Sequence, residues 1–286
     1  MIAQTRYVRR VSVAIEERFL RPAVMGVVNV TPDSFSDGGL FLDPELAAQQ
    51  ARRLLAEGAA LVDVGGESTR PGSDGVSAEE EIRRVEPVLE ALAGLPVSID
   101  TSKAEVARRA LELGAVMVND VTALRADPDL VGVIAGSEAY VCLVHMLDDP
   151  RTMQDDPRYD DVVSEVVSFL EGRLAYAVAL GIREERICLD PGIGFGKTVE
   201  HNLELLARLD EIASIGRPVV LGASRKRFLG RILGDPEALA GPVSVGVAVA
   251  VMAYERGASI FRVHDVREHV EALAAARAVE RACRTS

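Results

Sequence analysis

Side chains that can bind a polar ligand follow the short apolar runs of this sequence. The acidic and amide members of this set are Asp63, Asp100, Asn119, Asp120 and Asp190. Carboxylate and amide groups held in one pocket fit the edge of a flat ring that carries several N–H donors. Each hydrogen bond to a charged partner contributes about 1.5–3 kcal/mol. The sequence therefore indicates a site for a guanidine-like ring edge.

The basic members of the set point to a second kind of ligand. They are Arg70, Lys226, Arg262 and His264. Cationic side chains bind anionic groups, and a phosphate is the anion that this combination fits best. We therefore expect a ligand with a phosphorylated end.

The apolar runs that carry these residues are continuous, which is typical of parallel β-strands covered on both faces. We predict strands at Val24–Asn29, Leu61–Val64, Val97–Asp100, Val116–Asn119, Tyr140–His145, Ile187–Asp190, Val219–Gly222 and Ile260–His264. Helical patterns fill the intervals, at Pro44–Glu57, Ala78–Ala93, Lys103–Leu113, Pro128–Ala135, Asp160–Leu180, Val199–Ser214, Val243–Arg256 and Arg267–Arg281. Several helical runs end at a glycine suited to a left-handed C-cap, namely Gly58, Gly94, Gly114, Gly181, Gly216 and Gly257.

These strand–helix repeats predict a single α/β domain, a (β/α)8 TIM barrel, for which about 250 residues is typical. An open, doubly wound sheet is the alternative. We place the barrel at residues 23–286 and an N-terminal extension at residues 1–22, where Tyr7–Val13 is either an extra strand across the barrel bottom or an accessory contact. Parallel strands place their carboxyl ends on one rim, so the polar residues should meet there. Any one carboxylate could instead cap the helix that follows it.

Three glycine-rich segments follow strands. Thr31–Gly39 and Gly65–Gly72 have the backbone freedom of loops that close over a substrate, although each could be an ordinary mobile connection. The segment Asp190–Thr198 ends like a phosphate-binding P-loop, but Pro191 stands where that motif requires a glycine. We interpret its glycines as positions where backbone approaches a flat ligand beside Asp190.

Composition excludes several classes of protein. The net charge is −12 and aromatic residues make up only 4%, with no tryptophan, whereas nucleic-acid binding requires a basic face or a stacking platform. No apolar run reaches the roughly 20 residues of a membrane helix. Charged residues at positions 16–18 interrupt any signal peptide. We interpret Cys142, Cys188 and Cys283 as buried free thiols of a protein in a reducing compartment, the cytoplasm.

Seven motifs, in order along residues 24–266, resemble the dihydropteroate synthase family of the folate pathway. They are GVVNVTPDSFSDGG from Gly26, DVGGESTRPG from Asp63, SIDTS from Ser98, VNDV from Val118, DPGIGFGK from Asp190, GASRK from Gly222 and RVHDV from Arg262. The resemblance implies a transferase that condenses 6-hydroxymethyl-7,8-dihydropterin diphosphate with p-aminobenzoate, giving 7,8-dihydropteroate and diphosphate. It also implies that diphosphate leaves before the amine attacks, that the enzyme is a homodimer, and that sulfonamides act on it.

Matching motif positions imply a role for each site residue. The pterin would contact Asp100, Asn119, Met146, Asp190, Phe195, Gly222, Lys226 and Arg262. The diphosphate would contact Asn29, Arg70, Arg262 and His264, and Mg²⁺ would be held by Asn29 with either Asp33 or Asp37. The p-aminobenzoate pocket would consist of Phe35, Ser68, Thr69, Arg70, Pro71, Lys226 and Arg227. The catalytic residues would be Asp100, Lys226, Arg262 and His264.

One position departs from the pattern. Arg227 stands where some family members have a small hydroxyl residue that helps to hold the p-aminobenzoate carboxylate. Backbone N–H groups at the start of a helix would do more of that work here.

Two other functions share parts of these motifs. A barrel that transfers methyl groups from methyltetrahydrofolate to a corrinoid would use the same pterin pocket, but it has no need for the two loops or for the Ser224–Lys226 anion site. A non-catalytic pterin-binding paralogue should have lost basic residues, whereas Arg70, Lys226, Arg262 and His264 are all present.

Overall fold

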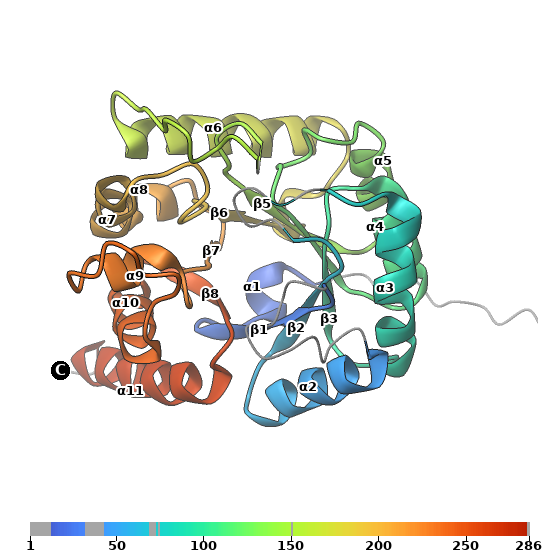
Figure 1. Cartoon of the computed structure of the whole chain (residues 1–286), viewed down its shortest axis with the longest axis horizontal. Helices are drawn as coiled ribbons and strands as arrows, with labels where there is room; N and C mark the ends of the chain where they lie inside the picture. Colours follow the sequence, from blue (N-terminus) through green and yellow to red (C-terminus); the bar gives the residue numbers. More distant parts are fainter. Residues whose placement is uncertain (1–12, 32–42, 69–72, 74, 150, 285–286) are drawn as a thin grey trace, which may run out of the picture.

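The computed structural model describes residues 13–31, 43–68, 73, 75–149 and 151–284. Eight parallel strands close into a barrel in sequence order, which confirms the predicted (β/α)8 architecture (Figure 1). The strands are β1 Ala23–Asn29, β2 Leu61–Gly65, β3 Val97–Asp100, β4 Met117–Asp120, β5 Tyr140–Val144, β6 Ile187–Asp190, β7 Val219–Leu221 and β8 Ala258–Val263. The barrel closes through pairing of β1 with β8, so the first and last strands become neighbours.

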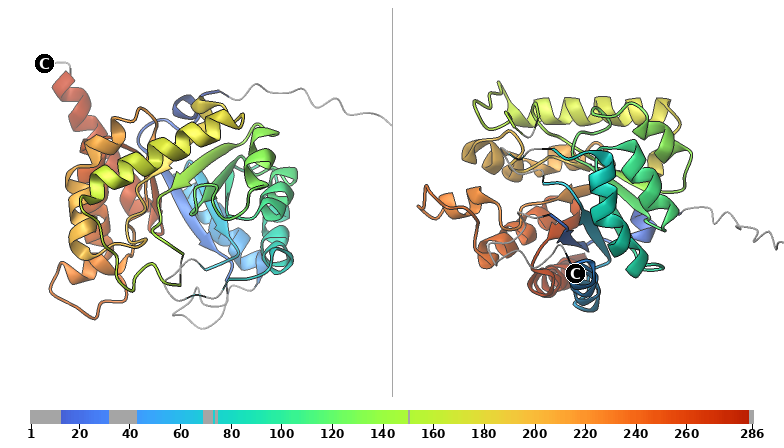
Figure 2. Two further views of the ribbon diagram at one scale, coloured as in Figure 1. Left: turned by 90° about the horizontal axis from the view of Figure 1, so that it is seen from above. Right: turned by 45° about the vertical axis from the view of Figure 1, so that its right-hand side comes forward.

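Helices surround the barrel on the outside (Figure 2). They are α2 Pro44–Ala56, α3 Ala78–Ala91, α4 Ala104–Glu112, α5 Leu130–Ala135, α6 Val162–Ala179, α7 Val199–Ala207, α8 Leu209–Ala213, α9 Arg227–Arg231, α10 Val243–Glu255 and α11 Val266–Arg284. The single helix predicted at Val199–Ser214 is two helices, because the backbone leaves the helical conformation at Arg208. A 3₁₀ turn, Glu184–Arg186, precedes β6. In the part of the chain that the structure describes, no helix has the length and apolar character to cross a membrane.

Alternation along the strands separates two sets of buried residues. Leu61, Met117 and Cys142 belong to a cluster inside the barrel, whereas their neighbours Val62 and Val118 pack outward against the helices. Successive side chains of a strand point to opposite faces. Asn29, Asp63, Asp100, Asn119, Asp190 and Arg262 therefore share the inward register, while Asp120 and His145 have the outward one.

The amino-terminal end of the barrel is closed by a short helix, α1 Ile15–Arg18, which lies at the centre of Figure 1. Ile15 and Phe19 are buried in the inner cluster, and the Phe19 and Tyr140 rings meet edge to face at 5.6 Å. The Tyr140 hydroxyl donates a hydrogen bond to the Val13 carbonyl at 2.9 Å. Thus a helix covers the barrel bottom. Residues 7–12 of the extra strand considered at Tyr7–Val13 lie outside the described residues.

The cysteines are free thiols, as predicted, but only two of the three are buried. Cys142 and Cys188 are paired residues of β5 and β6 inside the barrel. The interpretation of Cys283 as buried was wrong, because it lies on the exposed side of the last turns of α11. The glycines predicted to cap helices all have positive φ, between 82° and 106°.

Replacing Ile15 with alanine should lower the free energy of unfolding by about 2–5 kcal/mol, because the change leaves a cavity in a fully buried site. Urea denaturation measures the effect. Leu20→Ala is the matched control, since Leu20 is 63% exposed and surface substitutions change stability by roughly 0.5 kcal/mol or less. Equal stability of the two variants would show that α1 is no part of the core.

Candidate active site

An arginine between two carboxylates lies at the centre of the barrel mouth. Arg262, on β8, donates from Nε to Asp63 Oδ2 and from Nη2 to Asp100 Oδ2, both at 2.7 Å. Asn119, on β4, donates from Nδ2 to the same Asp63 oxygen at 3.2 Å. One guanidinium therefore joins side chains from β2, β3 and β8, and Asp63 also orients the amide of β4.

Burial sets the electrostatics of this cluster. Removal from water raises the pKa of Asp100 to about 7; the charge of Arg262 opposes the rise and that of Asp63 adds to it. Burial lowers the pKa of Arg262, but the combined charges of Asp63 and Asp100 raise it above the ordinary value. Among the described residues, Asp63 Oδ1 is buried without a hydrogen-bond partner. Such an atom is an acceptor that a ligand or an ordered water can satisfy.

A second part of the site joins β6 to the loop after β7. Asp190 Oδ1 accepts from the Gly192 amide at 2.7 Å. Lys226 Nζ donates to the Ile193 carbonyl and lies 4.3 Å from the centroid of the Phe195 ring. Burial lowers the pKa of Lys226 to about 8, although the charge of Asp190 opposes this change.

Two glycines leave space beside the charged groups. A Cβ atom on Gly222 would lie 3.8 Å from Asp190 Oδ2 and 3.9 Å from Arg262 Cβ. On Gly65 it would lie 3.3 Å from Asp100 Cβ and 3.8 Å from Asn29 Oδ1. Because glycine has no side chain, space remains between these polar groups. Gly65 borders both Asp100 and the Asn29 amide oxygen.

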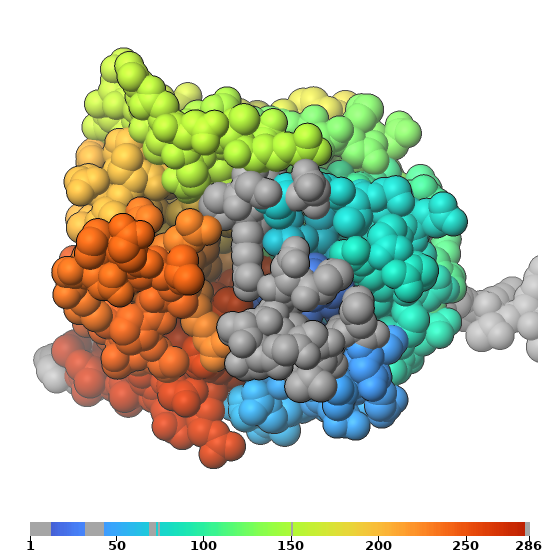
Figure 3. All heavy atoms as spheres, viewed as in Figure 1, coloured from blue at the N-terminus to red at the C-terminus, as the bar shows by residue number. Residues whose placement is uncertain are grey.

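Three of the four predicted basic residues, Lys226, Arg262 and His264, lie where β7 and β8 end, and the fourth, Arg70, lies outside the described residues. Ser224 Oγ lies 3.2 Å from His264 Nδ1 and also accepts from the His264 backbone amide at 3.2 Å. Arg225 donates from Nε to Asp265 Oδ2 at 3.0 Å, which fixes the two loops together. Arg227 is exposed at the first residue of α9. Figure 3 shows this face of the molecule, with a hollow beside the orange and red elements.

The loops after β2, β3, β4 and β5 border a cavity of about 450 Å³. Ser68, Arg125 and Met146 are among its lining residues. The Met146 carbonyl accepts from Arg125 Nη2 at 2.7 Å, which holds the end of β5. The predicted site residues Asp33, Phe35, Asp37, Thr69, Arg70 and Pro71 lie outside the described residues.

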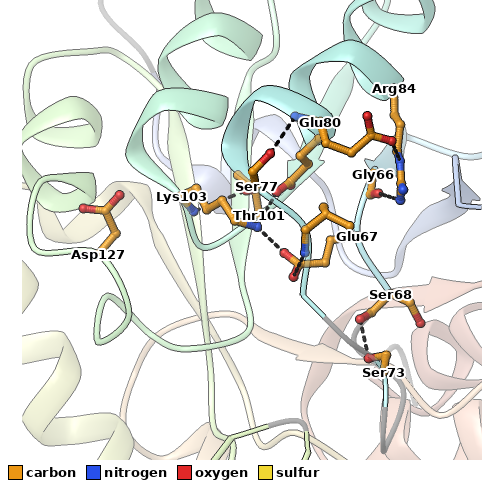
Figure 4. Close-up of polar contacts among 12 residues, drawn as sticks. Gly66, Glu67, Ser68, Ser73, Ser77, Glu80, Arg84, Thr101, Lys103 and Asp127 are labelled. Atoms are coloured by element: carbon orange, nitrogen blue, oxygen red, sulfur yellow. Dashed lines mark hydrogen bonds and ion pairs between the residues drawn. The ribbon is translucent and has the colours of Figure 1, made fainter.

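Hydrogen bonds fix both ends of the loop that follows β2 (Figure 4). Glu67 Oε1 accepts from the Val76 amide at 3.1 Å, and its other oxygen is paired with Lys103. Lys103 also donates to the buried Glu81 at 2.7 Å. Ser73 Oγ donates to the Ser68 carbonyl at 2.6 Å. The backbone at Ser68, where the chain leaves β2, is therefore fixed by these hydrogen bonds.

Polar residues with the outward register have structural roles instead. Asp120 was expected to face the ligand edge, but its Oδ1 accepts from the Thr122 amide at 2.8 Å and its Oδ2 from the Leu124 amide at 2.6 Å. Gly192 packs on backbone rather than leaving room for a ligand, since a Cβ there would lie 1.7 Å from the His145 carbonyl oxygen, whereas a Cβ on Gly194 would lie 3.0 Å from Lys226 Cδ. Alternation along each strand was the sequence signal that separates these residues from the inward set.

Asp63 is the functional residue that sequence reasoning undervalued. It was predicted only as one of several acceptors for a ligand edge, yet it holds both Arg262 and Asn119. Its inward register was visible in the sequence. Its pairing with Arg262 was not, because the two residues are 199 positions apart.

Residues 25–264 match the family model described as pterin binding enzyme, so the fold and site define a pterin-binding barrel enzyme. The chain is 46% identical over 261 residues to the dihydropteroate synthase of Neisseria meningitidis serogroup C, covering 89% of this chain and 92% of that protein. It is 46% identical over 257 residues to that of Escherichia coli strain K12, covering 88% and 89%. The chain belongs to the dihydropteroate synthase family, whose members are transferases.

Solved structures agree with the sequence relatives. A Yersinia pestis dihydropteroate synthase in a sulfonamide drug complex has a TM-score of 0.86 and 45% identity, covering 91% of this chain and 94% of that one. A Xanthomonas albilineans dihydropteroate synthase with 4-aminobenzoic acid has a TM-score of 0.83 and 48% identity, covering 91% and 93%.

Replacing Asp63 with asparagine should lower the free energy of unfolding by about 1–3 kcal/mol, because the buried Arg262 loses a charged acceptor. It should also weaken binding of 6-hydroxymethylpterin, since Arg262 and Asn119 lose their common anchor. Thermal denaturation and calorimetric titration measure the two effects. Asp210→Asn, at an exposed position of α8, should change neither. Wild-type affinity in Asp63→Asn would show that the anchor does not shape the site.

Proposed function

We propose that this protein condenses 6-hydroxymethyl-7,8-dihydropterin diphosphate with p-aminobenzoate, giving 7,8-dihydropteroate and diphosphate in folate biosynthesis. The observation that carries the proposal is the inward cluster at the barrel mouth, where Asp63 and Asp100 bind Arg262, Asn119 donates to Asp63, and Asp190 and Arg262 both border Gly222. A Xanthomonas albilineans relative with 46% identity and a TM-score of 0.80 was solved in complex with 7,8-dihydropteroate, which supports the same product here.

The inward acceptors account for the pterin end. Asp190 has one oxygen held by the Gly192 amide and the other facing the space beside Gly222, so a pterin edge that donates N–H groups can bind there. Asn119 and Asp100 provide further polar atoms from β4 and β3, and Arg262 is hydrogen-bonded to Asp100. Phe195 and the buried Met146 form apolar walls for the flat ring, with Lys226 above Phe195.

The loops after β7 and β8 account for the diphosphate end. His264, fixed by Ser224, and Arg262 are cations or donors on this side of the mouth, and Arg70 is the further residue proposed from the motif. Asn29 fits the role of a Mg²⁺ ligand because its amide oxygen, at the end of β1, lies on the rim near Asp100 and hard cations prefer oxygen ligands. When bound, Mg²⁺ would neutralise charge on the leaving diphosphate.

The p-aminobenzoate site is proposed at the adjoining loops. Ser68 is half-buried at the rim, and Lys226 and Arg227 begin the segment that leads into α9. Phe35, Thr69, Arg70 and Pro71 complete the proposed pocket from positions outside the described residues. Binding of 4-aminobenzoic acid by the Xanthomonas albilineans relative supports this assignment.

In the proposed reaction the bond between the pterin methylene carbon and the diphosphate oxygen breaks first. The electron pair leaves with the diphosphate, and positive charge develops on the methylene carbon. The ionised Asp100 carboxylate stabilises that charge, while Lys226, Arg262 and His264 stabilise the departing anion. The neutral amine of p-aminobenzoate then forms the C–N bond and releases its proton to solvent, so no general base is required.

Steady-state release of diphosphate from the pterin diphosphate should depend on both p-aminobenzoate and Mg²⁺, because turnover continues only when the amine captures the cation, and a sulfonamide should compete with p-aminobenzoate. Asp100→Asn should reduce turnover by about 10²–10³, the usual effect of removing one preorganised charged group.

In the wild type, kcat/KM should fall as the pH drops below about 7, because Asp100 has a pKa of about 7 and must be ionised. The variant should lack this acidic decline.

A discontinuous assay for diphosphate measures these rates, with Asp210→Asn as a control that keeps wild-type activity. Absence of release with all three components would indicate a pterin-binding protein that does not condense its ligand. Near-normal turnover in Asp100→Asn would contradict only the role of that carboxylate.

A cytoplasmic location and a homodimer are further parts of the proposal. The free thiols fit a reducing compartment. The outer face of α10 supports the dimer, because its exposed positions include Ala248 and Met252, with Val245 and Val251 half-buried beside them. Glu255 is the only charged residue of this helix. Contiguous apolar surface of this kind is typical of protein interfaces.

Met252→Glu should convert the dimer to a monomer, because it places a charge in an apolar interface at a position that is 48% exposed in the single chain. Sedimentation equilibrium measures the mass. Leu180→Glu, at the C-cap of α6 and 47% exposed, should leave the dimer intact. A wild-type protein that sediments as a monomer would contradict this proposal.

A further inference from the structure

Lys197 is a buried cation that the proposed reaction does not use. Only 3% of its surface is exposed, and its Nζ donates to the Phe195 carbonyl at 3.0 Å and lies 2.8 Å from His145 Nδ1. Both of these partners are uncharged, since burial lowers the pKa of His145 to about 2. Burial also places the pKa of Lys197 well below its ordinary value. Burying an amine without a carboxylate is costly, so the contact needs an explanation.

The contact joins two loops that already lie against each other. A Cβ on Gly192 would lie 1.7 Å from the His145 carbonyl oxygen, and one on Gly196 would lie 2.5 Å from Leu147 Cβ. Both glycines have positive φ, a conformation that glycine adopts at little cost. The loop after β6 therefore rests directly on the backbone that follows β5, and Lys197 links the two through side-chain atoms.

The loop after β6 also holds the Lys226 side chain in place. Lys226 Nζ donates to the Ile193 carbonyl and lies over the Phe195 ring, while a Cβ on Gly194 would lie 3.0 Å from Lys226 Cδ. The Gly194 backbone is itself held, because its amide donates to Asn202 Oδ1 at 2.7 Å. A displacement of residues 193–195 would therefore move both the aromatic wall and the ammonium group.

We propose that Lys197 and His145 are positioning residues for the pterin slot, whose contact ties the loop after β6 to the end of β5. His145 directly precedes Met146, and Lys197 holds the carbonyl of Phe195, so one contact sets two walls of the slot. The inference rests on the proposed function only in that Met146, Phe195 and Lys226 contact the pterin. Lys197 lies in the P-loop-like segment Asp190–Thr198. The inference assigns it to holding the loop that forms a wall of the pterin slot, and not to binding a phosphate.

Calorimetric titration with 6-hydroxymethylpterin tests the proposal on the full-length enzyme. Lys197→Met and His145→Leu should each weaken binding about tenfold, and the double variant should bind no more weakly than either, because both changes remove one contact. His145→Asn keeps an acceptor near the position of Nδ1 and should restore most of the affinity. The KM for p-aminobenzoate, measured at saturating pterin diphosphate, should change less than the pterin affinity, because Lys226 is the one described residue of that proposed pocket seated on this loop.

Arg186→Met is the matched control for the loss of a buried cation. Arg186 is also buried and donates to a carbonyl oxygen, that of Ser137 at 2.5 Å, but it precedes β6 at the opposite end of the strand. Its replacement should reduce stability without changing pterin affinity.

Wild-type affinity in both Lys197→Met and His145→Leu would overturn the inference, as would additive losses in the double variant. If Lys197→Met does not fold, His145→Leu and His145→Asn decide the question alone. Failure of the wild-type enzyme itself to bind the pterin would instead overturn the proposed function.

Discussion

The site depends on one ion-pair arrangement, the Arg262 guanidinium held between Asp63 and Asp100. Its members lie on β8, β2 and β3, and the pairs join residues 199 and 162 positions apart. They meet only because the barrel closes between β1 and β8. Removing one partner of a buried pair outright commonly costs about 3–5 kcal/mol, more than is expected for Asp63→Asn, which keeps an acceptor oxygen and leaves Asp100 paired with Arg262. The same contacts that orient the ligand groups therefore also favour the closed barrel over an open sheet.

Much of the fold was predictable from the sequence because its signals are local. Continuous apolar runs located every strand, with shifts of a residue or two such as β4 beginning at Met117 rather than Val116. Glycines after helices marked the C-caps. The helix α1 was missed because it spans only about one turn, too short for a helical periodicity to show. For α9 only a helix start beside Arg227 was expected, without bounds, and the helix is five residues long. The break at Arg208 between α7 and α8 carries no glycine or proline that would announce it.

The sequence predicted which residues belong to the site better than it predicted how they contact one another. Strand ends identified Asp100, Asn119, Asp190 and Arg262, and barrel geometry placed them together. Pairing across the barrel is a long-range property, so the central role of Asp63 needed the structure. Asp120 shows the opposite error, because it was grouped with the ligand-binding carboxylates although both of its oxygens accept from backbone amides. No role was predicted for Lys197, which is enclosed between two loops. The roles of the residues in Thr31–Gly39 and at Thr69–Pro71 rest on the family resemblance rather than on contacts.

The helix α1, which closes the amino-terminal end of the barrel, limits the route by which substrates enter and products leave. With Ile15 and Phe19 packed into the inner cluster, the barrel is a vessel with one opening rather than a tunnel. Both substrates must enter, and both products must depart, through the same mouth. A first ligand bound at the floor can leave only after whatever lies above it has gone. In the proposed assignment the pterin would bind to the inward side chains of the strands and the aminobenzoate to the loops at the rim, so the aminobenzoate end would leave first.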